Sequence, residues 1–369
     1  MWRWPQQVVV DQVPDPVIEA GTDAVVQVSA AVIGSQDLTV YGQSDGWMKS
    51  GTRLGREAVG TVTEVGPDVH LHRPGDRVVL CASYPCGRCG HCRQGQPDCC
   101  ERPAGAYRDF TTTGAHADHV RVAMADHALI GIGPELPDPT AVLLSHTLPS
   151  ALRAIDEAQL PQRALVAVIG LGPDGMIAAR MAITAGHDVI TVDHRPNARH
   201  RAQVAGITAI ALDADAPAHL LELQRGRRPD TTIETLGGSS IDPPSVRVLR
   251  PDARTRSNYR TEHTDGMLGT YVAIDITRPG GVVVLAAAYF SDVDVLPLRS
   301  MAEKGLRMSL CCTPQRDWRS RCLNHLNSGT WPASLAELST QRLPLADAST
   351  GYARLYNDDL EIDQVLLVP

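Results

Sequence analysis

Two short stretches of the sequence carry side chains whose types and spacing could do chemistry. The first holds four cysteines in the spacing C-x2-C-x2-C-x7-C, namely Cys86, Cys89, Cys92 and Cys100. Four thiolates complete the tetrahedral shell of a zinc ion and leave no open position, so such a site holds a loop together and does no chemistry itself. Composition alone leaves an iron–sulfur cluster as an alternative, and the neighbouring Cys99 could replace Cys100 as the fourth ligand.

The second stretch is a glycine-rich turn that fits G-x-G-x-x-G. It consists of Gly170, Leu171, Gly172, Pro173, Asp174 and Gly175. An apolar run over 164–169 precedes the turn, a helical pattern rich in Ala and Met follows it, and a second apolar run ends at Asp193. The glycines let the backbone approach a pyrophosphate, and the N–H groups at the start of the helix bind its charge. We therefore predict a strand–turn–helix–strand unit that binds a dinucleotide; the alternative is a turn that binds nothing.

The residues around Asp193 bear on which dinucleotide is bound. A carboxylate there would accept hydrogen bonds from the ribose hydroxyls and repel a 2′-phosphate, which favours NAD. His194, Arg195 and Arg199 follow at once and could soften that repulsion, so NADP remains an alternative. We expect Arg195 to lie at the cofactor in either case.

Length and composition set the frame around these stretches. A chain of 369 residues is longer than one core usually covers, so we expect two domains. A net charge of −8 and an aromatic content of 4% give no basic surface and no stacking platform for nucleic acid. No apolar run is long enough to span a membrane, and the N-terminus lacks the apolar core of a signal peptide. We expect a cytoplasmic homodimer or homotetramer, in which clustered cysteines bind metal rather than form disulfides.

Three regions of the chain must position this chemistry. Residues 1–150 are β-rich, with strand-like runs at 24–31 and 58–64 separated by Pro- and Gly-containing turns. Residues 151–300 alternate strand and helix patterns, as in a doubly wound parallel sheet. The polar segment 240–269 interrupts that alternation and is typical of an insertion. Residues 301–369 hold a short helix pattern near 318–327 and a closing strand at 364–368.

Together these features make the chain resemble a medium-chain dehydrogenase/reductase of the zinc-containing alcohol dehydrogenase type. The motifs that carry the resemblance are Val13-Pro14-Asp15-Pro16, Leu54-Gly55-Arg56-Glu57, Pro74-Gly75-Asp76-Arg77-Val78, the cysteine cluster, the glycine-rich turn and Arg278-Pro279-Gly280-Gly281. The resemblance implies an α/β protein with a GroES-like β-rich catalytic domain over 1–150, which includes a structural-zinc lobe. It further implies a Rossmann domain over 151–300, a return of 301–369 to the catalytic domain, and substrate bound in the cleft between the domains. Residues 144–149 and the polar segment near 240–270 resemble the branch that includes glutathione-independent formaldehyde dehydrogenase and formaldehyde dismutase.

The chain departs from this family where members bind a second, catalytic zinc. The ligand cysteine of the first stretch is replaced by Gly34, and the ligand histidine of Gly-His-Glu is replaced by Arg56. In the third stretch, Leu-Ser-Asp becomes Leu-Ser-His with His146. Glycine has no side chain and arginine offers only donors, so two of three ligands are lost. We therefore predict that the chain binds one structural zinc and no catalytic zinc.

The replacing residues are themselves candidates for catalysis. A guanidinium at Arg56 is a fixed positive charge that could bind a carboxylate or a developing oxyanion. His146 could act as general acid or base, and Glu57 lies next to Arg56 in the same stretch. Two alternatives stay open. One is a salt bridge that holds Arg56 to Glu57 or Asp37, and the other is a rebuilt metal site formed by Glu57, His146 and a histidine of 114–119.

Three functions are compatible with these residues. The leading one is an NAD(P)-dependent oxidoreductase that moves hydride without a catalytic metal, to or from a conjugated C=C, C=N or carbonyl group of a small metabolite. The second is an alcohol or aldehyde dehydrogenase with a rebuilt metal site, or a redox-neutral enzyme that retains its NAD. The third is a non-catalytic protein that has kept the nucleotide site.

Overall fold

The structure is a computed structural model of the whole chain, and it describes residues 1–42, 49–102, 114–213, 215–237, 267–287, 289, 296–311, 316–358 and 361–369. These residues form two compact units, one of Met1–Pro149 with Thr313–Pro369 and one of Ser150–Cys312. The expected α/β fold class, with one β-rich unit and one unit built on a parallel sheet, is confirmed. The expected insertion at 240–269 lies outside the described residues up to 266; its last residues begin a helix instead.

The unit 150–312 is organised around a six-stranded parallel sheet. Its strand order is β10 (Thr208–Ala211), β9 (Asp188–Asp193), β8 (Leu165–Ile169), β11 (Thr231–Glu234), β12 (Val282–Leu285) and β13 (Arg307–Leu310). The central strands β8, β11 and β12 are buried along their whole length, as expected when helices cover both faces of a sheet. The order of the strands reverses between β8 and β11, which is the place where doubly wound sheets bind nucleotides.

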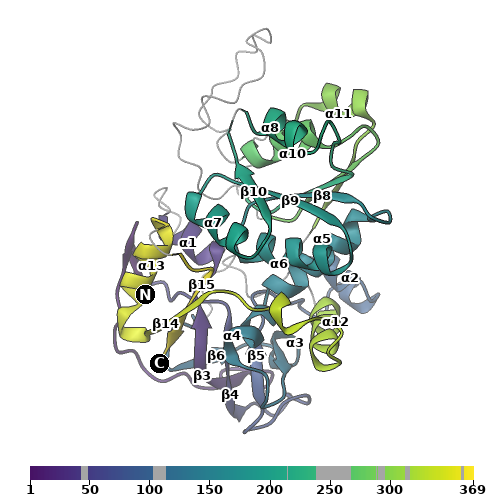
Figure 1. The fold of residues 1–369 in the computed structure, drawn as a ribbon. Coiled ribbons are helices and arrows are strands. Elements are labelled where there is room, and N and C mark those ends of the chain that lie inside the picture. The colour runs from purple at the N-terminus through teal and green to yellow at the C-terminus, as the bar shows by residue number, and fades with distance from the viewer. Residues whose placement is uncertain are drawn as a thin grey trace. The chain divides into compact units, whose positions relative to one another are not determined.

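Helices flank this sheet on both faces (Figure 1). They are α5 (Thr147–Ala158), α6 (Pro173–Thr184), α7 (Pro196–Val204), α8 (Ala216–Leu223), α10 (Leu268–Ile276) and α11 (Leu298–Lys304). The helix α6 packs against β8 and β9, and it buries the Ala- and Met-rich face that the sequence pattern predicted. The strand β13 pairs with β12 and so belongs to this unit, which therefore extends past residue 300.

The other unit is built on a seven-stranded sheet drawn from both ends of the chain. Its order is β14 (Thr340–Pro344), β15 (Gln364–Val368), β3 (Ala24–Val32), β4 (Ala58–Val65), β5 (Arg77–Leu80) and β7 (Leu129–Gly131), and β6 (His119–Val122) also pairs with β3. The strand β15 lies antiparallel to β3, with Leu366 opposite Val32. The predicted strands at 24–31, 58–64 and 364–368 are confirmed.

Shorter elements complete this unit. They are the hairpin of β1 (Trp2–Trp4) and β2 (Gln7–Val8), and the helices α1 (Ser35–Gly42), α2 (Gly90–Arg93), α3 (Ala125–Ala128), α4 (Asp138–Ala141), α12 (Arg316–Asn327) and α13 (Ala348–Tyr356). The helix predicted near 318–327 is confirmed as α12. None of the helices within the described ranges has both the length and the apolar character needed to cross a membrane.

His116 ties three parts of this unit together. One ring nitrogen, Nε2, lies 3.0 Å from the Val32 carbonyl oxygen, and the other, Nδ1, lies 3.1 Å from the Tyr352 hydroxyl of α13. Because a carbonyl can only accept, Nε2 carries the proton and Nδ1 accepts from Tyr352. Burial lowers the pKa of His116, and the nearby Asp37 opposes that shift only in part. The neutral ring is therefore the form that fits the fold.

This geometry predicts a loss of stability in mild acid. The unfolded chain takes up a proton at His116 below a pH of about 6.5, whereas the folded chain resists it. The free energy of unfolding therefore falls as the pH drops through that value. We expect the melting temperature to fall between pH 7.5 and pH 5.5, and the fall to be smaller in His116→Gln. His119→Gln, in β6, is the matched control, and an unchanged pH dependence in His116→Gln would contradict the prediction.

Candidate functional site

The glycine-rich turn between β8 and α6 needs its three glycines for three different reasons. Gly170 has a φ of +93°, a left-handed conformation that other residues rarely adopt. A Cβ on Gly175 would lie 1.8 Å from the Gly170 carbonyl oxygen, so only glycine lets α6 pack this closely. A Cβ on Gly172 would meet nothing within 4 Å. Fold packing therefore does not explain Gly172, whereas a pyrophosphate lying against the backbone does.

The first turn of α6 fits an anion, with one opposing charge. The helix begins at Pro173, whose missing N–H costs nothing at this position, and the following N–H groups point out of the helix end. Asp174 lies in the same turn, where its carboxylate stabilises the helix but repels a phosphate. A dinucleotide bound at this turn would therefore be held by the backbone rather than by side-chain charge.

Asp193, at the end of β9, is fully buried, and both of its carboxylate oxygens are hydrogen-bonded to neighbouring residues. Its Oδ2 accepts from the Leu171 N–H at 2.6 Å, and its Oδ1 accepts from the Arg195 N–H at 2.7 Å. The Arg195 guanidinium lies 3.2 Å from Oδ2. Burial alone would raise the pKa of Asp193, but the charge and hydrogen bonds of Arg195, together with His194, lower it. Asp193 is thus an ionised carboxylate whose charge is largely balanced by Arg195.

Arg199 shapes the same loop from α7. Its Nη1 donates to the carbonyl oxygens of Asp193 and His194, each at 2.8 Å. The guanidinium is therefore used to hold the loop after β9. Of the two arginines, Arg195 is the one whose charge bears on the carboxylate of Asp193.

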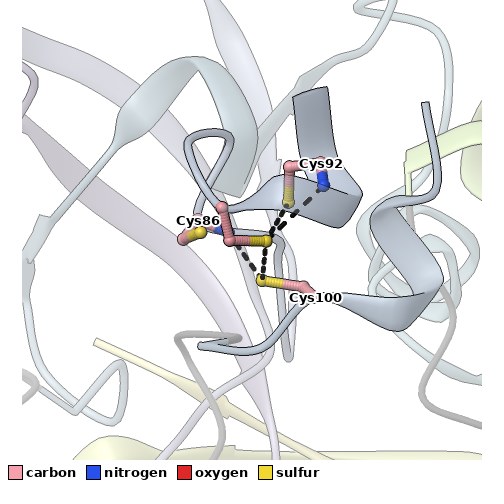
Figure 2. A group of neighbouring side chains, drawn as sticks. Cys86, Cys92 and Cys100 are labelled. Carbon is pink, nitrogen blue, oxygen red and sulfur yellow. Dashed lines mark hydrogen bonds between the residues drawn. The ribbon is translucent and has the colours of Figure 1, made fainter. Parts of the chain in front are cut away.

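The four predicted zinc ligands converge in the unit 1–149. The ligand atoms of Cys86, Cys89, Cys92 and Cys100 all lie within 4.8 Å of one another, and Figure 2 labels three of these residues, Cys86, Cys92 and Cys100, in one cluster. The Cys89 sulfur lies 3.4 Å from that of Cys92 and 4.0 Å from that of Cys100. Zinc–sulfur bonds of about 2.3 Å in a tetrahedron place sulfurs about 3.8 Å apart. The donor set therefore fits a structural zinc ion.

Backbone N–H groups favour the thiolate form of Cys89. The N–H groups of Cys92 and Glu101 lower the pKa of Cys89 to about 6, which favours the thiolate that a metal ligand must be. Cys99, the alternative fourth ligand, is exposed and is not part of the cluster.

Charged side chains crowd position 34, where the family resemblance implies a ligand of the catalytic zinc. A Cβ on Gly34 would lie 2.7 Å from Glu57 Oε1 and 3.3 Å from Asp37 Oδ2. Asp37 is itself fixed, because it accepts from the N–H groups of Gly34 and Gly55 at 2.8 and 3.3 Å. A cysteine at position 34 would collide with Glu57 as this side chain now lies.

Arg56 and Glu57 are both buried and face each other. Arg56 is 6% exposed, and its Nη2 lies 3.7 Å from Glu57 Oε1, while its Nη1 lies 3.5 Å from the Ala82 carbonyl oxygen. These are long contacts, so the ion pair that was one of the two alternatives for Arg56 is present but loose. The other oxygen of Glu57 accepts a short hydrogen bond from the Ser145 hydroxyl.

Among the residues that the structure describes, the histidines do not gather into a second metal site. His146 is partly exposed and directly follows Ser145 in the chain. Both ring nitrogens of His116 are engaged, as described above. In the part of the chain that the structure describes, the four cysteines are the one group of three or more His, Cys, Asp or Glu side chains close enough to share a metal ion.

Sequence reasoning missed two residues of this site, Ser145 and Arg319. Ser145 holds Glu57, and Arg319 of α12 reaches the Ser145 carbonyl oxygen with its Nε at 3.2 Å. An arginine three residues before the buried Cys322 on the same helix could have drawn attention, since it falls on the apolar face. Tyr41 of α1 lies in the core, where it packs against Tyr352 with ring centroids 5.2 Å apart, and burial raises its pKa.

Comparison with known proteins matches this fold and these motifs. The model of the alcohol dehydrogenase GroES-like domain matches residues 20–132. A probable zinc-binding alcohol dehydrogenase of Mycobacterium tuberculosis is 29% identical over 92% of this chain and 80% of its own length. The solved alcohol dehydrogenase of Thermus sp. ATN1 superposes with a TM-score of 0.80 at 26% identity, covering 100% of this chain and 98% of that one.

The chain belongs to the medium-chain dehydrogenase/reductase family. It is accordingly an oxidoreductase of the alcohol dehydrogenase-like type. A formaldehyde dismutase of Pseudomonas putida is also similar, with 26% identity over 82% of this chain and 79% of its own.

For this medium-chain dehydrogenase/reductase, the Asp193–Arg195 pair predicts how cofactor choice responds to mutation. Arg195→Ala leaves the buried carboxylate unbalanced, so that it repels a 2′-phosphate more strongly. We expect the dissociation constant for NADPH to rise about tenfold relative to that for NADH, which equilibrium fluorescence titration would measure. Arg225→Ala, an exposed arginine of the same unit, should leave the ratio unchanged. An unchanged ratio in Arg195→Ala would show that Arg195 does not govern cofactor choice.

The cysteine cluster predicts the metal content of the purified protein. We expect about one zinc ion per chain by elemental analysis, because the four thiols form a closed tetrahedral shell. Cys92→Ser and Cys100→Ser should lose the zinc and melt at a lower temperature, whereas Cys99→Ser should retain it. Zinc retained by Cys100→Ser and lost by Cys99→Ser would reverse the assignment of the fourth ligand, and bound iron would refute zinc.

Proposed function

We propose that this protein is an NAD(P)-dependent oxidoreductase that transfers hydride without a catalytic zinc, to or from a conjugated C=C, C=N or carbonyl group of a small metabolite. The observation that carries the proposal is the Glu57 carboxylate, which lies where a cysteine at position 34 would need to place its side chain. Gly34 offers no ligand atom and Arg56 offers only hydrogen-bond donors. The donor set does not fit a catalytic zinc, so no step of the mechanism uses one.

The residues of the glycine-rich turn fit a dinucleotide. The open space at Gly172 and the N-terminus of α6 would take the pyrophosphate, and Asp193 lies where the adenosine ribose would be bound. When bound, the reduced cofactor supplies a hydride. The buried carboxylate of Asp193 supports NAD as the preferred cofactor. Its pairing with Arg195 weakens its repulsion of a 2′-phosphate, so NADP remains an alternative.

Arg56 and His146 would perform the two tasks that remain on the substrate. Hydride addition to the β-carbon of a conjugated carbonyl compound moves an electron pair onto the carbonyl oxygen. The substrate thereby becomes an enolate. The Arg56 guanidinium would stabilise that negative charge. His146 would then give a proton to the adjacent carbon, so that one hydride and one proton complete the reduction. Glu57 would orient Arg56 through their ion pair.

A conjugated acceptor suits such a site better than a simple ketone. Conjugation spreads the developing charge, so the substrate needs less help from a strong Lewis acid. A rebuilt metal site is the weaker proposal because His116 already uses both nitrogens within the fold. The similarity to a formaldehyde dismutase keeps a redox-neutral reaction with retained NAD as a second candidate. We expect a small-molecule substrate and a homodimer or homotetramer.

Substitution of Arg56, combined with metal analysis, tests the proposal. We expect about one zinc per chain and oxidation of NADH or NADPH with α,β-unsaturated carbonyl compounds or imines. Arg56→Met should lower kcat about 100-fold, as expected on loss of one group that stabilises an oxyanion, and Arg56→Lys should lower it less. Arg53→Met, three residues earlier and partly exposed, is the control. Two zinc ions per chain, with activity on alcohols abolished by a chelator, would instead establish the rebuilt metal site.

A further inference from the structure

Arg319 is a fully buried arginine in the unit of residues 1–149 and 313–369, and no motif of the family drew attention to it. It comes from α12, far along the chain from the other site residues. Its Nη2 donates to the Ser83 carbonyl oxygen at 2.7 Å and its Nε to the Ser145 carbonyl oxygen at 3.2 Å. One planar guanidinium therefore joins two stretches that are separated by more than 50 residues in sequence.

Both of these stretches contact a candidate catalytic group. Ser145 donates its hydroxyl to Glu57 while its carbonyl accepts from Arg319, so one residue is bound at both ends. The Ala82 carbonyl, next to Ser83, lies 3.5 Å from Arg56 Nη1. Arg319 thus fixes the neighbours of Glu57 on one side and the neighbour of Arg56 on the other.

Stability alone is a poor reason for an arginine at this position. Moving a guanidinium out of water is costly, and a well-packed apolar side chain of similar size usually stabilises a fold as well or better. Among the residues that the structure describes, Nη1 of Arg319 has no hydrogen-bond partner and no carboxylate lies within ion-pair distance of the guanidinium. What an arginine offers here is a rigid fork of donors that holds two carbonyl groups at a fixed separation and angle.

We propose that Arg319 is a positioning residue of the active site. By holding the peptide groups of Ser83 and Ser145, it sets where the Ser145 hydroxyl meets Glu57 and where Arg56 meets the backbone. The hydrogen bond from Arg319 to the Ser145 carbonyl also positions the backbone of His146, the next residue in the chain. The effect on catalysis rests on the proposed function, whereas the effect on geometry does not.

The variants Arg319→Met and Arg319→Lys test this inference. Methionine fills the space without donors, so we expect kcat for the reduction to fall about 10- to 100-fold while the KM for NADH stays unchanged. Lysine keeps a charge and a donor but no rigid fork, so it should rescue the rate in part. The control is Arg321→Met on the same helix, where an exposed guanidinium stacks over Trp318 at 4.6 Å. A fall in kcat matched by Arg321→Met would overturn the inference.

A double-mutant cycle with Ser145→Ala separates positioning from mere stability. If Arg319 acts through Ser145, the double variant should be little slower than the slower single variant, because the same contact is lost in both. Fully additive losses in kcat, at equal melting temperatures, would show that Arg319 does not act through Ser145.

A crystal structure of Arg319→Met gives a readout that does not need a substrate. We expect Ser145 to have left Glu57 and the Ser83 and Ser145 carbonyl groups to have moved apart. If those contacts are unchanged, the inference is wrong whatever the enzyme reduces. If instead the contacts are lost but the wild-type protein oxidises no cofactor with any acceptor, the proposed function fails and the positioning role stands.

Discussion

The Glu57 carboxylate is buried in the fold, away from water. Most of the candidate site provides the hydrogen-bond donors and the positive charge that a buried carboxylate requires. One oxygen accepts from Ser145, and the other faces Arg56 and closes off position 34. An unpaired buried charge costs several kcal/mol, so each partner must itself be held in place. Arg319 holds Ser145, and the Ala82 carbonyl lies near Arg56. The positive charge that faces Glu57 is therefore supplied by protein side chains.

The parallel-sheet unit depends on a different kind of constraint. Its turn is set by backbone distances, such as the 1.8 Å that would separate a Cβ on Gly175 from the Gly170 oxygen. Side chains enter only at its edge, where Asp193 is tied both to Leu171 and to Arg195. A site made of backbone tolerates changes in neighbouring charge, as the presence of Asp174 in the first turn illustrates. The site around Glu57 has no such tolerance, because each of its side chains is held by a contact with another residue of the site.

This difference explains which features could be predicted from the sequence. The strand, turn and helix around Gly172 and the zinc lobe are local, so spacing alone indicates their geometry. The replacement of ligands by Gly34 and Arg56 could also be seen, because it needs only a family pattern for comparison. The links made by Ser145 and Arg319 could not, since they join residues 88 and 174 positions apart. Contacts of that range are decided by how strands and helices pack, and a single sequence does not encode them as a pattern.

The strand β15 has a consequence for how the protein is made. It pairs with β3, yet it leaves the ribosome only after the whole of the unit 150–312 has been synthesised. The parallel-sheet unit is continuous in sequence and can fold while translation proceeds. In the other unit, β6 can pair early with one end of β3, but the other end, at Ala31 and Val32, must wait for β15. Until then β3 offers free backbone groups to any passing strand. Chaperone dependence and losses to aggregation during expression should therefore originate in the N-terminal half, even though its fold is the one finished last.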